Sequence, residues 1–177
     1  MLAATLDLLG EVGYGRLTIE GVAARAGVGK STIYRLWPGK LELAEDAIGS
    51  LKAAVAVPDE GTVRERVVAL LRQVARITAG PTWSSCLPAI IDAAERDPEV
   101  AALHRRTSAE RRQVLVDLLA EGVRAGEVDA GLDLELAAEC LAGPILVRRL
   151  LLHEPFDPDA VPRLVEQVLA VPHPPPA

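Results

Sequence analysis

The chain has 177 residues, of which 50% are hydrophobic, 25% are charged and 3% are aromatic, and its net charge is -6. A chain of this length can form one large domain, or one small and one medium domain, and its core must be aliphatic. No uncharged apolar run reaches the length of about 18 residues that a membrane span needs, and MLAATLDLLGEVG at the N-terminus lacks the features of a secretion signal, so we expect a soluble cytoplasmic protein with no membrane partner.

The first part of the chain predicts four short helices. Apolar residues recur at helical spacing over residues 2–12, before a glycine-rich GYG. Thr18 is a good N-cap for a second helix, and Gly27 ends it. A third helix is predicted over residues 29–36, and a fourth over residues 41–56.

Longer amphipathic segments follow the turn-forming PDEG at residues 58–61. Their apolar spacing and their Asp caps predict helices over residues 63–79, 84–95, 98–124, from Asp133 onward, and from Asp157 to about residue 170. The terminal PHPPPA predicts a disordered tail. The fold class is therefore all-α, with about nine helices.

The string ARAGVGKST at residues 24–32 fits two incompatible motifs. Its second half matches the phosphate-binding P-loop, although Ala24 stands where that loop has its first glycine. A P-loop follows a hydrophobic strand, whereas the preceding TIEGVAAR has the spacing of a capped helix. A P-loop nucleotide-binding enzyme is therefore a remote alternative to a helix-turn-helix.

A helix-turn-helix explains the same residues individually. Ala23 is small where two helices approach, and Gly27 can adopt the left-handed backbone of the turn. Val28 and Ile33 can close the small core between the two helices. The second helix of such a pair lies in the major groove of DNA.

The side chains of that second helix suit DNA contacts. Residues 29–32 are short or cationic at its N-terminus, where such helices face the bases. Arg35 suits a bidentate guanine contact, whereas Lys30 and Tyr34 suit phosphates. The alternative for each is plain solvent exposure, or for Tyr34 packing against the scaffold.

Charge is unevenly distributed along the chain. Residues 16–40 contain five basic residues and one acidic residue, Glu20, so this segment carries +4 and the rest of the chain carries -10. Phosphate attraction acts within about a Debye length, roughly 8 Å, so a local basic patch can bind DNA on an acidic protein. An ordinary solvated surface is the alternative.

Residues 17–43, LTIEGVAARAGVGKSTIYRLWPGKLEL, resemble the DNA-binding signature of the TetR (tetracycline-repressor-like) family of bacterial transcriptional regulators. That signature has a Thr opening the second helix, an AxxAGV turn, a Tyr, an aromatic residue and a Lys. Here these are Thr18, Ala23 to Val28, Tyr34, Trp37 and Lys40. Residues 124–151 resemble the C-terminal part of the family more weakly.

The resemblance implies a three-helix DNA-binding head joined to a larger helical regulatory and dimerisation domain. With the boundaries above, the head covers residues 1–40, a connecting helix 41–56, the ligand-binding and dimerisation domain 57–171 and the tail 172–177. The resemblance and the motif together give the candidate DNA-binding residues Thr18, Gly29, Lys30, Ser31, Thr32, Tyr34, Arg35 and Lys40.

Apolar side chains near the C-terminus exceed what one monomer is expected to cover. They are Leu141, Ile145, Leu150, Leu152, Val161, Leu164, Val165 and Val168. In the TetR family the last two helices pair with those of a second subunit, so we expect a homodimer on a palindromic double-stranded DNA operator. The alternative is that these residues complete the monomer core.

A small-molecule effector is the third expected partner. Trp83, Thr107 and Arg111 are the candidate pocket residues, because Thr107 and Arg111 continue the apolar stripe of their helix and Trp83 is a large aromatic residue. An ordinary core with solvated charges is the alternative for these residues.

The sequence gives no sign of catalysis, of a cofactor or of a metal site. Cys86 and Cys140 are isolated, and the three histidines are scattered, so no nucleophile with a base can be assembled. We therefore predict a ligand-responsive transcriptional repressor that binds its operator as a homodimer and is released by an effector. The alternative is a helical small-molecule-binding or interaction module without DNA binding.

Overall fold

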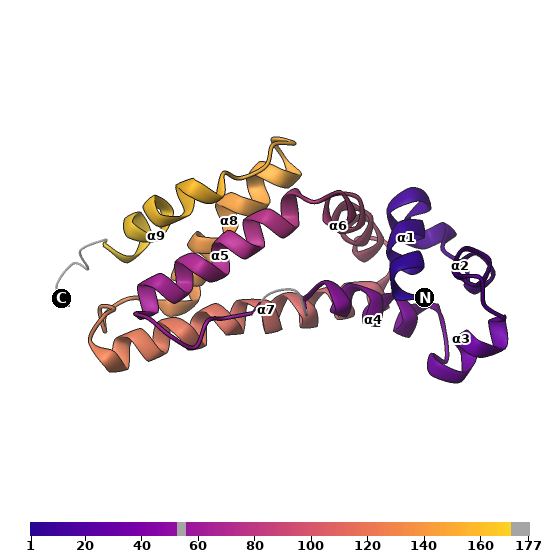
Figure 1. Ribbon diagram of the computed structural model, residues 1–177, viewed down its shortest axis with the longest axis horizontal. Helices are drawn as coiled ribbons and strands as arrows, with labels where there is room; N and C mark the ends of the chain where they lie inside the picture. Colours follow the sequence, from indigo (N-terminus) through magenta and orange to yellow (C-terminus); the bar gives the residue numbers. More distant parts are fainter. Residues whose placement is uncertain (53–55, 171–177) are drawn as a thin grey trace. The chain divides into compact units, whose positions relative to one another are not determined.

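The computed structural model describes residues 1–52 and 56–170, and within them all regular structure is helical (Figure 1). The chain forms two compact units. The N-terminal unit comprises the described residues of Met1–Ala54 with Gly80–Thr107, and the C-terminal unit those of Val55–Ala79 with Ser108–Ala177. In the described ranges no helix is both long and apolar enough to cross a membrane.

The N-terminal unit is built around its first helix. Its elements are α1 (Leu2–Arg16), α2 (Ile19–Ala26), α3 (Lys30–Leu36), α4 (Lys40–Lys52), α6 (Pro81–Ala94) and the first part of α7 (Pro98–Ala125). Helix α1 packs against α2, α4 and α6. The core of this unit includes the fully buried Leu9, Ile33 and Leu43.

One helix boundary in this unit agrees with the sequence expectation and one differs from it. The glycine-rich GYG interrupts α1 as predicted, because the backbone of Gly13 is non-helical, with φ 74° and ψ 166°. One further turn then follows to Arg16. Helix α6 begins at Pro81 rather than at residue 84, since a proline at the first helical position needs no N–H partner.

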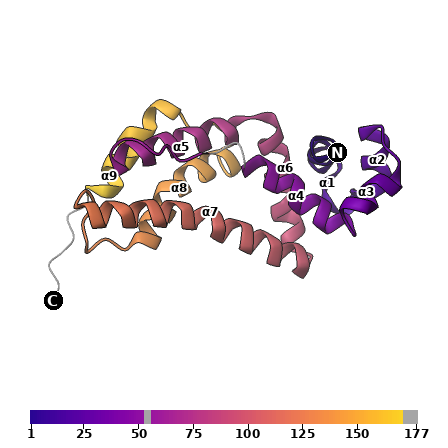
Figure 2. The same ribbon diagram turned by 60° about the horizontal axis from the view of Figure 1, so that its bottom comes forward.

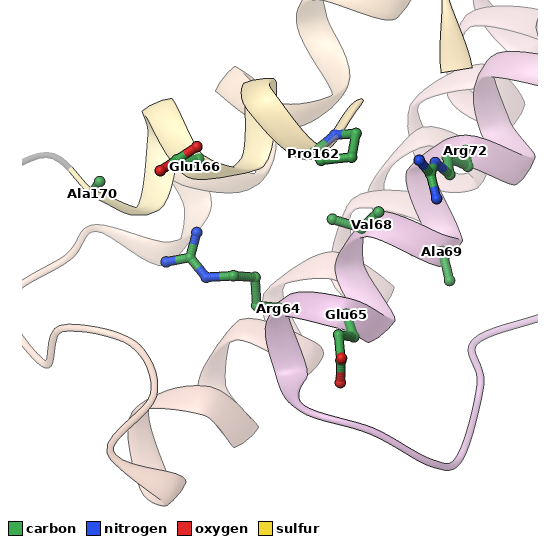
Figure 3. Close-up of a pocket in the computed structure, with 8 residues that line it drawn as sticks. All are labelled: Arg64, Glu65, Val68, Ala69, Arg72, Pro162, Glu166 and Ala170. Carbon is green, nitrogen blue, oxygen red and sulfur yellow. The ribbon is translucent and has the colours of Figure 1, made fainter. Parts of the chain in front are cut away.

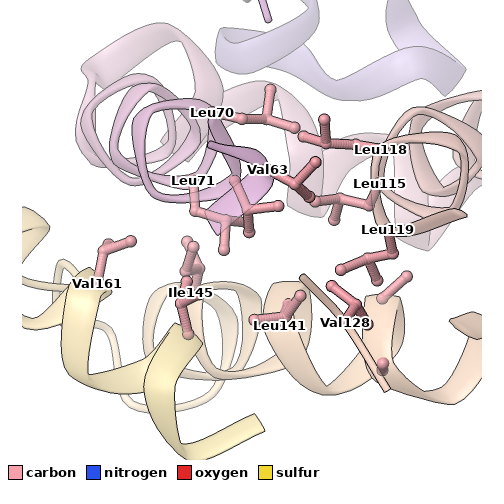
Figure 4. Close-up of a cluster of buried hydrophobic side chains, with 14 of the residues drawn as sticks. Val63, Leu70, Leu71, Leu115, Leu118, Leu119, Val128, Leu141, Ile145 and Val161 are labelled. Carbon is pink, nitrogen blue, oxygen red and sulfur yellow. The ribbon is translucent and has the colours of Figure 1, made fainter. Parts of the chain in front are cut away.

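The C-terminal unit contains α5 (Val63–Ala79), the rest of α7, α8 (Leu134–Leu150), a 3₁₀ turn (Pro158–Ala160) and α9 (Val161–Leu169). Helices α5, α8 and α9 contact one another and lie side by side in both views (Figures 1 and 2). Figure 4 shows their aliphatic side chains meeting those of α7 in one core. The aliphatic core that the sequence predicted is therefore present in this unit.

Polar caps fix two helix starts of the C-terminal unit. The Asp133 carboxylate accepts the Leu136 N–H at 3.0 Å and caps α8, as the sequence predicted. Asp157 accepts the Asp159 N–H at 2.9 Å, but it caps the 3₁₀ turn, and α9 itself begins at Val161 without a side-chain cap. The Glu127 carboxylate accepts the Val63 N–H at 2.7 Å and so caps α5 from a distant loop, which the sequence did not indicate.

The two units do not follow the predicted domain boundary near residue 57. Residues 80–107 belong to the N-terminal unit by their contacts, because α6 packs on α1. The division into a DNA-binding and a ligand-binding domain is a functional one and stays a prediction. The expected tail at 172–177 lies outside the described residues. So do residues 53–55 of the predicted helix 41–56.

Helices α1 and α6 are in close contact at Gly10. A Cβ on Gly10 would lie 2.7 Å from the Ser85 Cβ, and the Cys86 Sγ donates to the Leu6 carbonyl at 3.1 Å nearby. We predict that Gly10→Ala lowers the free energy of unfolding by about 1–2 kcal/mol, because overpacking costs more than the roughly 1 kcal/mol that helix propensity gains. Urea denaturation measures this change.

Gly49→Ala is the matched control. Gly49 lies within α4, and a Cβ there meets no atom within 4 Å. Its substitution should raise stability by about 0.5–1 kcal/mol through helix propensity alone. Equal stabilisation by both alanines would show that the α1–α6 contact has room for a side chain.

Candidate nucleic-acid interface

The turn between α2 and α3 has the geometry of a helix-turn-helix. The Thr18 Oγ1 accepts the Gly21 N–H at 3.1 Å and caps α2. At the other end Gly27 is left-handed, with φ 66° and ψ 32°. The Val28 N–H bonds the Ala23 carbonyl at 3.0 Å and the Gly27 N–H bonds the Ala24 carbonyl at 3.3 Å, which is a Schellman ending.

A helix, and not a strand, therefore precedes the GKS sequence. Helix α2 runs from Ile19 to Ala26 directly before Gly27. A P-loop needs a strand at this place, so the P-loop interpretation of residues 24–32 is wrong.

Helix α3 turns one side inward and leaves the other side open. Ile33 is fully buried in the core of the N-terminal unit, and the half-buried Val28 packs against that core. On the other side Lys30, Ser31 and Arg35 are exposed, and Tyr34 has 53% of its surface exposed. Tyr34 therefore does not pack against the scaffold.

Side-chain contacts to α4 and α1 fix the short segment that joins α3 to α4. The Trp37 Nε1–H donates to the Asp46 carboxylate at 2.7 Å, and the indole is buried. The Lys40 ammonium donates to the Tyr14 carbonyl at 3.1 Å and lies 4.3 Å from the centroid of the Tyr14 ring. Because an ammonium has three donors, Lys40 can still offer a hydrogen bond to a phosphate.

The pKa of Tyr14 is raised, first by burial and then by the nearby carboxylates of Asp97, Glu99 and Glu42. The phenol therefore stays neutral over the physiological range. Its ring is a fixed surface beneath the Lys40 ammonium, and this contact was not apparent from the sequence, where the two residues are far apart.

Ion pairs engage two of the five basic residues in this segment. Arg25 forms a bidentate pair with Glu11, at 2.9 and 2.7 Å, between α2 and α1. Lys30 donates to the Glu20 carboxylate at 3.1 Å, between α3 and α2. Both pairs are exposed, so they stabilise the fold little, and they matter mainly for the charge that the surface presents.

None of the three candidate effector residues lines the groove between α5 and α9 that is described below. The Thr107 hydroxyl is buried and donates to the His104 carbonyl at 3.2 Å, and Trp83 is half-buried. Arg111 is half-buried, and burial lowers its pKa. Their role as a pocket stays a prediction.

An open groove of about 690 Å³ lies between α5 and α9 (Figure 3). Apolar residues form part of its wall, and charged side chains from both helices border it. The lining residues are Arg64, Glu65, Val68, Ala69, Arg72, Pro162, Glu166 and Ala170. The sequence did not indicate this groove, because its two walls are far apart in the chain.

The candidate dimer residues divide into two groups. Leu141, Ile145, Val161 and Val165 are fully buried within the C-terminal unit, where they complete the core of the single chain. A side chain with no exposed area cannot also contact a partner, so the prediction that these four are dimer residues is corrected in favour of the alternative, that they complete the monomer core. Leu150, Leu164 and Val168 are half-buried and Leu152 is exposed.

A different stripe of α8 faces outward. Leu136, Cys140, Val147 and Leu151 are exposed at intervals of four, seven and four residues, which places them on one side of this helix and its end. The sequence contained this signal, because these positions lie on a different face of the helical wheel from the buried ones. Because α8 is apolar on both faces, the sequence did not indicate which face is buried.

Comparisons with known proteins cover both units. Residues 1–47 match the family model of the bacterial regulatory proteins of the tetR family, and residues 57–168 match that of the tetracyclin repressor-like C-terminal domain. The DNA-binding transcriptional repressor TetR of Mycobacteroides abscessus is 33% identical over 97% of this chain and 90% of its own length. An uncharacterised HTH-type transcriptional regulator of Mycobacterium tuberculosis is 30% identical over 96% of this chain and 84% of its own.

Solved structures show the same arrangement of helices. The crystal structure of the TetR family transcription regulator SCO0332 superimposes with a TM-score of 0.76 at 32% identity, and it covers 98% of this chain and 96% of its own. These likenesses agree with the all-α fold that the sequence predicted.

Substitutions of Thr18 can separate its structural role, as the cap of α2, from its predicted contact with DNA. Its oxygen accepts the Gly21 N–H, so its O–H remains able to donate to a phosphate. We predict that Thr18→Ala lowers both DNA affinity and the free energy of unfolding, the latter by about 1 kcal/mol, through loss of the cap.

Thr18→Asp is the informative comparison, because aspartate caps helices well but repels phosphates. It should keep the melting temperature near that of the unaltered protein and yet weaken binding to duplex DNA, which thermal denaturation and fluorescence anisotropy measure. Unchanged DNA affinity in the aspartate variant would assign Thr18 a structural role only.

Proposed function

The chain belongs to the TetR family of bacterial transcriptional regulators, and we propose that it is a repressor that binds a palindromic operator as a homodimer and leaves it when a small-molecule effector binds. The observation that carries this proposal is the exposed polar face of α3, which is held outward by the buried Ile33 and the left-handed Gly27. The family consists of regulators, not enzymes.

The proposed interface combines positioning and reading contacts. Thr18, Lys30, Tyr34 and Lys40 would bind phosphates. Gly29, Ser31 and Thr32 with Arg35 would face the groove. Exposure of Tyr34 and Arg35 supports these roles, as does the charge of +4 on residues 16–40. The operator is the double-stranded DNA partner that these contacts require.

Arg35 should provide sequence preference. Its guanidinium can form two hydrogen bonds to guanine, so Arg35→Ala should weaken binding to the operator by about 1–3 kcal/mol and binding to random DNA by much less. Fluorescence anisotropy with the promoter fragment of its own gene, and with a random duplex of equal length, measures both affinities.

Arg105→Ala is the matched control, because Arg105 is an exposed arginine of α7 that the proposed interface does not include. It should leave both affinities within about two-fold of those of the unaltered protein. Equal losses on both duplexes for Arg35→Ala would make Arg35 a phosphate contact instead of a base contact.

The outward stripe of α8 is the proposed dimer surface. Leu136, Val147 and Leu151 are large apolar side chains open to solvent, and a two-fold axis would bury them against the same residues of a second chain. Two copies of α3 would then face one side of the duplex, which requires a palindromic operator.

Val147→Glu should therefore produce monomers. A carboxylate in an apolar interface costs enough to weaken dimerisation at least about ten-fold, and operator binding should fall with it. Val114→Glu is the control, because Val114 on α7 is similarly exposed, at 42% against 46% for Val147, but lies outside the stripe. Sedimentation velocity measures the oligomeric state.

Cys140 provides an independent readout of the same surface. It is exposed within the stripe, whereas the other cysteine, Cys86, is buried. A short bismaleimide should link two chains through Cys140 in the unaltered protein and not in Val147→Glu. A dimer that persists in Val147→Glu without this link would place the interface elsewhere.

The effector would act by a population shift. In one conformation of the dimer the two α3 helices would not match successive major grooves. A small molecule that binds this conformation better lowers the affinity for the operator. We propose a mostly apolar effector, with Trp83, Thr107 and Arg111 as the residues to substitute first. The action of such a repressor on DNA would take place in the cytoplasm.

A further inference from the structure

Glu20 is the one acidic side chain in the basic segment of residues 16–40. It lies in the first turn of α2, two residues after the cap Thr18, and its carboxylate accepts a hydrogen bond from Lys30 in the first turn of α3 at 3.1 Å. A negative charge therefore lies beside two of the residues that would contact phosphates. Neither the motif nor the comparisons assign it a role.

Stabilisation of the fold does not account for this pair. The side chains are 55% exposed for Lys30 and 62% exposed for Glu20, and exposed pairs of this kind contribute little to stability. The pKa of Glu20 is lowered, first by its own backbone N–H and then by Lys30, so the carboxylate is charged at neutral pH. Its charge acts on whatever approaches this surface.

We propose that Glu20 limits the affinity of the protein for all duplex DNA by holding Lys30 in an ion pair that competes with phosphate, an inference that rests on the proposed function. When the head binds, Lys30 must break or share this pair, and the carboxylate is left near the phosphates. Both effects depend on the backbone of DNA and not on its sequence.

Such a limit suits a regulator that must be released. Allosteric coupling between an effector and an operator typically changes affinity by about 5- to 150-fold. Phosphate contacts that were too strong would keep the protein on DNA when the effector is bound. A carboxylate that cancels the charge of one lysine lowers the affinity without altering the base contact proposed for Arg35.

The test is the charge-neutral substitution Glu20→Gln. It should raise affinity for the promoter fragment and for a random duplex of equal length by similar factors, about three- to ten-fold at low salt. It should also steepen the slope of log K against log salt by about one, because Lys30 then acts as an additional phosphate contact. Fluorescence anisotropy over a salt series measures both effects.

Two further variants make the result specific. Glu11→Gln neutralises the acid of the other exposed ion pair, Arg25–Glu11, in the same unit, and should change affinity by less than about two-fold. In a Lys30→Gln background, Glu20→Gln should lose at least half of its gain in log affinity, because the lysine that it releases is gone.

The outcomes separate this inference from the proposed function. If the unaltered protein binds the duplexes and Glu20→Gln binds them no more tightly, or keeps its full gain without Lys30, the role of Glu20 is refuted and the proposed function stands. If neither the unaltered protein nor Glu20→Gln binds any duplex, both are refuted.

Discussion

The left-handed backbone at Gly27 determines which side of α3 reaches solvent. It reverses the chain after α2, and the Schellman hydrogen bonds to Ala23 and Ala24 fix the angle at which α3 leaves. Ile33 then anchors α3 in a core shared with α1 and α4. Because a helix of seven residues has little stability alone, this anchoring, more than helix propensity, holds Lys30, Tyr34 and Arg35 outward.

Charge is unevenly distributed along the chain, and the net charge does not show this. The protein carries -6 overall, yet the segment around α2 and α3 carries +4. Even within that segment some cations are already engaged. Lys30 and Arg25 each form an ion pair with a carboxylate, and the Lys40 ammonium lies over the Tyr14 ring. Arg35 is the exposed cation of α3 whose geometry suits base contacts best, which concentrates the proposed sequence preference in one side chain.

Local features were predictable from the sequence, and long-range ones were not. The caps at Thr18 and Asp133 and the turn at Gly27 depend on neighbours within a few residues, and all three were confirmed. The Glu127 cap on α5 and the Lys40–Tyr14 contact join distant segments, so spacing gave no sign of them. The face of α8 was misassigned at Leu141 and Ile145 because this helix is apolar on both sides.

The most direct measurement of the central claim is hydroxyl-radical footprinting of the promoter region of its own gene. If two outward-facing α3 helices bind successive major grooves, the protein protects two half-sites related by a dyad, with centres roughly 34–36 Å apart or a multiple of a helical turn. Protection without two-fold symmetry would contradict the account. So would the absence of any protection when the dimer is in large excess over the DNA.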